Sequence, residues 1–215
     1  MQQRRVVVTG LGALTPIGLG LSAYLDGLRS GVSGAAPIQL FDATGFRTTF
    51  ACELKGFDVA DYLDKKEFRR MDRFSQMAVI SSDEAIADAG LNTDQLDRTR
   101  VGVLMGSGIG GLKTFEEEIT KVAHQDEPPP RFNPFFIPKM IVDIAPGHIS
   151  MKHGFQGPNY STVSACATGT NALIDAYMLI QQGQADCMIA GGAEAAVNQT
   201  GIGGFNAMKA LSTRN

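Results

Sequence analysis

The stretch Ser161-Thr-Val-Ser-Ala-Cys-Ala-Thr-Gly-Thr170 predicts a strand that passes directly into a helix. Its beginning is strand-like, because Tyr160, Thr162 and Val163 favour extended structure. Apolar residues at helical spacing follow it, at Ala172, Leu173, Ala176, Tyr177 and Ile180. We therefore expect Cys166 to lie at the junction between the strand and the helix.

A cysteine at the start of a helix is a candidate nucleophile. The first backbone N–H groups of a helix have no partner within it and bear partial positive charge, which stabilises a thiolate. Ala165, Ala167 and Gly169 are small enough to let a substrate carbonyl approach, and the same N–H groups are suited to a developing oxyanion. The alternative is a small cysteine buried in the core, which is the usual fate of a free cysteine.

Strands and helices alternate along the rest of the chain. Short buried strands are predicted at residues 6–8, 101–105 and 187–190. Helices are predicted at residues 18–29, 65–89, 112–123 and 137–153, the last with breaks near Pro138 and Pro146, and a proline-rich loop at residues 128–130. This alternation is typical of an α/β fold with a mostly parallel sheet.

Composition excludes several classes of protein. With 44% hydrophobic and 19% charged residues, the 215-residue chain should form a packed core. A net charge of -3, without a basic stripe, gives no sign of nucleic-acid binding, and no run approaches the ~18 apolar residues of a membrane span. Cys52, Cys166 and Cys187 are odd in number and widely spaced, which argues against a disulfide framework and against a zinc site and suits a reducing cytoplasm.

Several motifs together resemble one enzyme family. Val163-Ser-Ala-Cys-Ala-Thr-Gly169 is similar to the nucleophile segment of the β-ketoacyl-acyl-carrier-protein synthases, the condensing enzymes of fatty acid synthesis. Further segments resemble the same family in the same order: Arg4-Arg-Val-Val-Val-Thr-Gly-Leu-Gly12, Gly106-Ser-Gly-Ile-Gly-Gly111, Asn133-Pro-Phe-Phe-Ile-Pro138, Ala190-Gly-Gly-Ala-Glu194 and Gly203-Gly-Phe-Asn-Ala-Met-Lys-Ala-Leu-Ser-Thr-Arg-Asn215. The resemblance covers nearly the whole chain and is closest to the type II members.

The resemblance implies a thiolase-like fold, in which two similar halves each supply a βαβαβ layer. Residues 1–215 would form the N-terminal half, with a mixed, mostly parallel sheet and helical insertions. Chains of the family are roughly twice as long, and their two catalytic histidines and a lysine would lie beyond Asn215.

The resemblance also implies an acyltransferase reaction and its partners. Cys166 would take an acyl group from a carrier thioester, and decarboxylation of a malonyl-carrier would then give a carbanion equivalent that attacks the acyl-enzyme. No metal or other cofactor is expected, since the phosphopantetheine arm of an acyl carrier protein delivers the substrate. The expected partners are that acyl carrier protein and a second copy of the chain, with no nucleic acid and no membrane.

Individual site residues follow from the same resemblance. The acyl pocket would be lined by Ile109, Gly110, Gly111, Phe136, Ala165 and Phe205, with Phe136 reaching the pocket of the second subunit. Basic residues facing the carrier protein would be Lys66, Arg69, Arg70, Arg131 and Lys209.

Other interpretations remain open from the residues. The stretch Gly106–Gly111 matches the dinucleotide pattern G-x-G-x-x-G, although the expected acidic residue about 20 positions on falls in a loop. The basic cluster of Lys65, Lys66, Arg69 and Arg70 is also compatible with an ordinary solvated helix face. Phe135 and Phe136 are also compatible with burial in the core of their own chain. For the whole chain, the alternatives are a fragment that folds and dimerises without turnover, or a thiolase-type relative acting on coenzyme A esters. His148 and His153 lie near Cys166 in sequence, but nearness in sequence does not establish a Cys–His pair.

Overall fold

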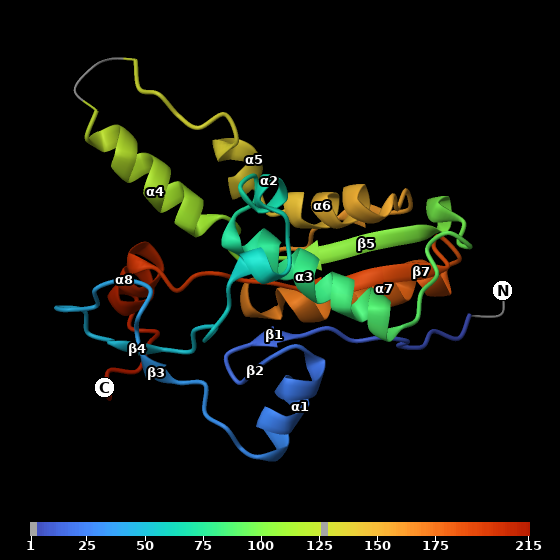
Figure 1. Ribbon diagram of the computed structural model, residues 1–215, viewed down its shortest axis with the longest axis horizontal. Coiled ribbons are helices and arrows are strands. Elements are labelled where there is room, and N and C mark those ends of the chain that lie inside the picture. Colours follow the sequence, from blue (N-terminus) through green and yellow to red (C-terminus); the bar gives the residue numbers. More distant parts are fainter. Residues whose placement is uncertain (1–3, 126–128) are drawn as a thin grey trace.

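The computed structural model describes residues 4–125 and 129–215, and its centre is a parallel sheet (Figure 1). Strand β5 (Val101–Gly106) lies between β6 (Asn159–Tyr160) and β7 (Cys187–Gly192). All residues of β5 are buried, as expected for a central strand of a parallel sheet. The predicted strands at residues 101–105 and 187–190 are therefore confirmed.

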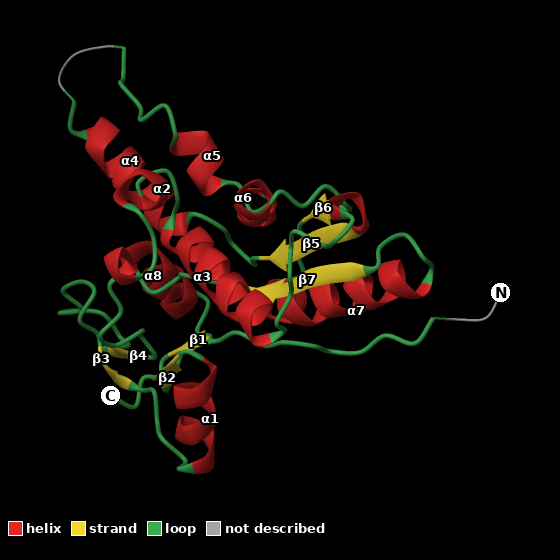
Figure 2. Cartoon of the chain, turned by 45° about the vertical axis from the view of Figure 1, so that its right-hand side comes forward, coloured by secondary structure: helices red, strands yellow, loops and turns green. Residues whose placement is uncertain are grey.

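Helices cover both faces of this sheet (Figure 2). Val101, Val103 and Met105 of β5 join a core cluster with α3 (Arg73–Asp88) and α6 (Ile144–His153). Helix α7 (Thr168–Gln181) packs on the opposite face, where a Cβ added at Gly106 would overlap the Thr168 side chain. Because successive side chains of a strand point to opposite faces, β5 can contribute to both layers.

The predicted helix at residues 65–89 is two helices, α2 (Lys65–Phe68) and α3. Asp72 separates them: its backbone is extended, with φ −73° and ψ 162°, and its carboxylate accepts a hydrogen bond from Phe74 N at 3.1 Å. An aspartate at this position is an N-cap, which competes with continuation of the preceding helix. The single-helix prediction was wrong for this reason.

Helix α4 (Leu112–Ala123) matches its prediction, whereas the segment 137–153 breaks at a different place. Helix α5 (Phe136–Met140) and α6 are separated by residues 141–143, so Pro138 and Pro146 lie inside helices. Each proline is in a first turn, where backbone N–H groups have no helical partner and a missing donor costs little. Of the predicted proline-rich loop, Pro128 lies outside the described residues.

The N-terminal segment contradicts its prediction as a buried strand. Residues 6–8 form no strand, and Val7 and Val8 are 58% and 79% exposed. The chain then lies along α3, where Leu11 N donates to Asp88 at 2.9 Å and Ala13 N donates to Glu84 at 2.8 Å. Carboxylates of α3 therefore bind the backbone amides of residues 11 and 13, just after the predicted strand.

The remaining elements are short. Strands β1 (Leu14–Thr15) and β2 (Gly18–Leu19) pair antiparallel, as do β3 (Ala36–Pro37) and β4 (Phe50–Ala51). Helix α1 (Leu21–Arg29) begins three residues later than the predicted helix at 18–29, because Gly18 and Leu19 belong to β2. The other helical segments are η1 (Val59–Asp61), η2 (Arg98–Arg100), η3 (Ala165–Ala167) and α8 (Gln199–Ala207).

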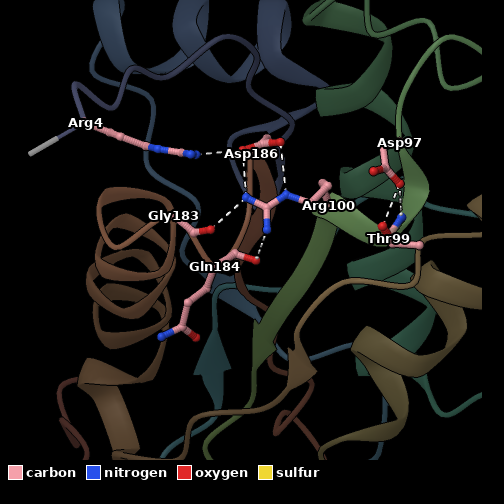
Figure 3. A network of polar contacts seen from close by, with 7 residues as sticks. All are labelled: Arg4, Asp97, Thr99, Arg100, Gly183, Gln184 and Asp186. Carbon is pink, nitrogen blue, oxygen red and sulfur yellow. Dashed lines mark hydrogen bonds and ion pairs between the residues drawn. The ribbon is translucent and has the colours of Figure 1, made fainter.

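A network of charged residues holds the N-terminal ends of β5 and β7 together (Figure 3). Asp186 accepts hydrogen bonds from Arg4 at 2.7 Å and from Arg100 at 2.9 Å. Arg100 also donates to the backbone carbonyls of Gly183 and Gln184. The hydrogen bonds from Arg100 and Arg4 lower the pKa of Asp186 to about 2. This network leaves the carboxyl ends of the strands for the candidate site.

The outer face of α7 is apolar and uncovered in this chain. Ala172 and Ala176 are buried toward the sheet, whereas Leu173, Ile174 and Tyr177 are about half exposed.

Within residues 4–125 and 129–215, no helix combines the length and apolar character needed to cross a membrane.

Candidate active site

Cys166 lies in η3, between β6 and the first residue of α7, and its side chain is exposed. The predicted strand-to-helix junction is confirmed, and the alternative of a buried core cysteine is wrong. Cys187 differs, because it is partly buried in β7 and burial raises the pKa of its thiol. Cys166 therefore combines access from solvent with the positive end of a 14-residue helix.

Hydrogen bonds on both sides hold the turn around Cys166. Ser164 N donates to Thr168 Oγ1 at 2.8 Å, and Thr162 Oγ1 donates to the Thr168 carbonyl at 3.2 Å. Asn171 Nδ2 donates to Ser164 Oγ at 2.6 Å. Ala165 has a positive φ of 51°, a conformation that is strained for a residue other than glycine. The candidate nucleophile Cys166 thus lies on a constrained turn.

The glycine-rich loop after β5 binds a carboxylate of this same chain. Glu194 accepts hydrogen bonds from Gly108 N at 2.7 Å, from Ile109 N at 3.1 Å and from Ser107 Oγ at 3.1 Å. Consecutive N–H groups of this kind are what a nucleotide phosphate would require. Since Glu194 already occupies them, the geometry argues against the dinucleotide interpretation.

The loop lies directly beside the turn that carries Cys166. A Cβ added at Gly108 would lie 3.5 Å from the Ala165 carbonyl oxygen and 3.6 Å from Ala165 Cα. Gly110 has φ of 80°, which permits the tight turn, and Gly111 N donates to the Met140 carbonyl at 3.0 Å. The structure therefore places Gly108 next to Ala165 and connects Gly110 and Gly111 to the end of α5, while Ile109 lies between them in the same loop.

The two phenylalanines predicted for the acyl pocket lie on separate elements. Phe136, at the start of α5, stacks with Phe132 at 5.4 Å and with Phe115 at 6.3 Å between ring centroids. Phe205 is half-buried on α8, which α4 holds through a hydrogen bond from Thr200 N to Glu116 at 2.9 Å. These two rings cover part of the Phe136 side chain within its own chain. The contact of Phe136 with a second subunit stays a prediction.

The predicted basic residues fall into separate groups on the surface. Lys66, Arg69 and Arg70 are exposed on and after α2, and the Arg70 guanidinium lies 5.3 Å from the centre of the Phe135 ring. Arg131 is exposed before α5, and Lys209 is exposed after α8. Within the described ranges, none of these five side chains forms an ion pair.

The histidines near Cys166 in sequence belong to α6, on the other face of the sheet from α7. His153 Nε2 lies 2.8 Å from Asp83 Oδ1, and its ring stacks on Phe155. Burial lowers the pKa of His148. In the part of the chain that the structure describes, no hydrogen bond joins a histidine to Cys166, and no group of three or more His, Cys, Asp or Glu is placed to hold a metal ion.

Three residues that organise the site were not predicted as site residues. Glu194 was recognised only as the end of a motif, and Thr168 only as part of the nucleophile stretch. Asp72 is buried and accepts hydrogen bonds from both Thr114 N and Thr114 Oγ1, which joins the start of α3 to α4. The sequence signal for Glu194 was an acidic residue after a pair of glycines, and the signal for Asp72 was an acidic residue before a helix. Neither signal identifies the hydrogen-bond partners, because these are distant in sequence.

Comparison with known proteins identifies relatives of this chain. Residues 3–215 match the family described as "Beta-ketoacyl synthase, N-terminal domain". The chain is 47% identical over 215 residues to 3-oxoacyl-(acyl-carrier-protein) synthase 2 of a Synechocystis species, and 45% identical over 217 residues to the protein of that name from Staphylococcus aureus. Both alignments cover 100% of this chain and 51% of the relative, so the chain spans about half the length of these curated relatives.

A solved structure supports the same conclusion about the fold. The ishigamide ketosynthase/chain length factor superposes on the chain with a TM-score of 0.88 at 28% identity, over 98% of this chain and 52% of that one. The α/β fold expected from the sequence, of the thiolase-like kind, is confirmed.

Proposed function

Because this chain belongs to the β-ketoacyl synthase family, we propose that it provides the acyl-accepting half of a 3-oxoacyl-acyl-carrier-protein synthase. The observation that supports this proposal most is the exposed Cys166 thiol at the N-terminus of α7, beside a glycine loop. The relatives named above are acyl-carrier-protein synthases, and the chain aligns with them over its full length.

In the first proposed step, the Cys166 thiolate attacks the carbonyl carbon of an acyl thioester. A carbon–sulfur bond forms to Cys166, and the bond to the phosphopantetheine sulfur breaks, so that the carrier leaves as a thiolate and takes up a proton. Backbone N–H groups at the start of α7 are suited to stabilise the oxyanion of the tetrahedral intermediate. The hydrogen bonds from residues 162 and 164 to Thr168 tie the turn that carries Cys166 to the start of α7.

In the second proposed step, a malonyl-carrier loses carbon dioxide and the resulting carbanion attacks the acyl-Cys166 carbonyl. The carbon–sulfur bond to Cys166 then breaks and the thiolate is regenerated. The substrates are carried on phosphopantetheine, and the reaction requires no metal or redox cofactor. Since the relatives are about twice as long, condensation is proposed for the whole protein and acyl transfer for Cys166 of this chain.

We propose an acyl carrier protein as the partner of the basic surface. Lys66, Arg69 and Arg70 are exposed near α5, and side chains of this charge would steer an acidic partner toward the acyl site. Charge reversal at Arg69 should lower the affinity for the carrier more than the same change at Arg29, which is exposed on α1. Equal effects of the two substitutions, measured by titration calorimetry, would contradict this role.

Peptide mass mapping after reaction with a limiting amount of an acyl thioester tests the assignment of the nucleophile. The adduct is expected on Cys166, while Cys52 serves as a second exposed thiol in the same molecule and Cys187 as a partly buried one. Cys166→Ser should remove the adduct. Labelling mainly at Cys52 or Cys187 would refute the assignment.

The alternative of a fragment without turnover has its own test. Groups for acid–base catalysis typically contribute about 10²–10⁴ to a rate, and the resemblance assigns them to the second half of the family's chains. Residues 1–215 alone should therefore accept an acyl group but release little carbon dioxide from a malonyl-carrier. Rapid release by this purified chain would exclude the fragment interpretation.

A further inference from the structure

Glu194 connects the end of β7 to the loop that follows β5. Ala193 N donates to the Gly106 carbonyl at 3.0 Å, which places the next residue at the carboxyl ends of the two strands. The Glu194 carboxylate then accepts from two backbone N–H groups and one hydroxyl of residues 107–109. In the described ranges, no lysine, arginine or histidine forms an ion pair with Glu194. Neutral donors of the loop are therefore its hydrogen-bond partners.

The two carboxylate oxygens have different partners. Oε2 accepts from Gly108 N and Ile109 N, whereas Oε1 accepts from Ser107 Oγ. Ser107 Oγ in turn accepts from Gly110 N at 3.0 Å. The backbone or side chain of every residue from 107 to 110 is thus bound directly by Glu194 or through Ser107.

This loop determines what lies next to the nucleophile. Gly108 is in contact range of Ala165, the residue before Cys166, and Ile109 is 41% exposed. Since the Ile109 N–H is bound by Glu194, the carboxylate sets the position from which the Ile109 side chain extends. Movement of the loop would shift both the Ile109 side chain and the Gly108 backbone that lies next to Ala165.

We infer that Glu194 is a positioning residue, which holds the 107–110 loop against the Cys166 turn and thereby selects the acyl chains that reach Cys166. The statement about acyl chains rests on the proposed function. The statement about the loop does not, because it concerns the amides of Gly108 and Ile109 alone. The two can therefore be tested separately.

Three substitutions at position 194 separate hydrogen bonding from charge. Glu194→Gln keeps an oxygen that can accept from both amides, and its NH₂ group can donate to Ser107 Oγ, which has a free acceptor site. Glu194→Asp keeps the charge but is one methylene too short to reach the loop. Glu194→Ala removes every acceptor. Glu117→Ala is the matched control, because Glu117 lines the same cavity of about 340 Å³ as Glu194 and is exposed, with Lys113 Nζ at 3.7 Å.

Amide hydrogen exchange at Gly108 and Ile109 is the readout of the loop. We expect exchange to be at least about tenfold faster in Glu194→Ala and Glu194→Asp than in the parent chain, because both amides lose their hydrogen-bond acceptor. Glu194→Gln and Glu117→Ala should stay within about threefold of the parent. Exchange in the parent chain as fast as in Glu194→Ala would overturn the inference, as would equal exchange in Glu194→Gln and Glu194→Ala.

Selectivity for the acyl chain is the readout of the site. The rate of Cys166 acylation is measured with short-chain and long-chain acyl thioesters, while iodoacetamide labelling of the partly buried Cys187 in the same molecules controls for general unfolding. The ratio of long-chain to short-chain rates should change at least about fivefold in Glu194→Ala and Glu194→Asp and should be restored in Glu194→Gln. An unchanged ratio in all variants would overturn the selectivity part, whereas absence of acylation in the parent chain would instead count against the proposed function.

Discussion

Replacing Asp72 by alanine should destabilise the chain strongly, because this carboxylate caps one helix and ties it to another. Asp72 is 3% exposed. Its Oδ1 accepts from Phe74 N at 3.1 Å, and its Oδ2 accepts from Thr114 N at 3.0 Å and from Thr114 Oγ1 at 2.6 Å. The substitution would remove the N-cap of α3 and leave two buried donors of Thr114 without an acceptor.

The magnitude follows from these two losses. An N-cap contributes about 1 kcal/mol, and a buried donor left without a partner costs about 1–3 kcal/mol. Relaxation of the cavity shares the second cost between the Thr114 amide and hydroxyl, so we expect a total of about 3 kcal/mol for Asp72→Ala. For a chain of this length that loss corresponds to a decrease of about 6–12 °C in Tm.

Urea unfolding followed by circular dichroism measures this free energy of unfolding. Asp58→Ala is the matched control, because Asp58 is an exposed N-cap that accepts a single hydrogen bond, from Ala60 N at 2.9 Å. Its loss should be at most about 1 kcal/mol. Asp72→Asn should be intermediate, since one oxygen can still cap α3 while its NH₂ group faces the Thr114 donors. Equal losses for Asp72→Ala and Asp58→Ala would refute the reasoning that burial and the second helix determine the cost.

Three further predictions concern charge, thiol reactivity and assembly. The pKa of Asp186 is lowered in the folded chain to about 2 from the usual 3.8, so the stability it contributes is present above pH 3.8 and is lost as pH falls toward 2. Asp186→Asn should accordingly unfold more easily than the parent chain at pH 6, and the difference should shrink to a small fraction of that value at pH 2, where the carboxyl is about half protonated in the folded chain. A difference as large at pH 2 as at pH 6 would contradict the Arg100 and Arg4 pairing. Cys187 should react with iodoacetamide at least about tenfold more slowly than Cys166 at pH 8, because burial raises the pKa of its thiol and limits access; similar rates by mass spectrometry would oppose this. Phe136→Asp should weaken a homodimer measured by sedimentation if this ring extends to a second subunit, as proposed from the resemblance, whereas Phe132→Asp, which changes a neighbouring ring of the same stack, should weaken it less.

The amino-acid sequence by itself determined the features that depend on local patterns. The β5 strand, the α4 helix and the junction at Cys166 follow from runs and spacings within a few residues, and the structure confirms them. Such predictions succeed because the period of the hydrophobic pattern reflects the geometry of a single element. The ordered motifs likewise identified the family before any contact was known.

Only the tertiary structure decided the features that depend on distant partners. Residues 6–8 have a strand-like composition, but the chain after them obtains its acceptors from α3 instead of from a strand. Asp72 ends one helix and begins another while binding Thr114, 42 positions away, and Glu194 binds Ile109, 85 positions away. The sequence around a carboxylate does not specify which backbone amides it will bind. Those amides come within hydrogen-bond distance only when separate strands and helices pack together.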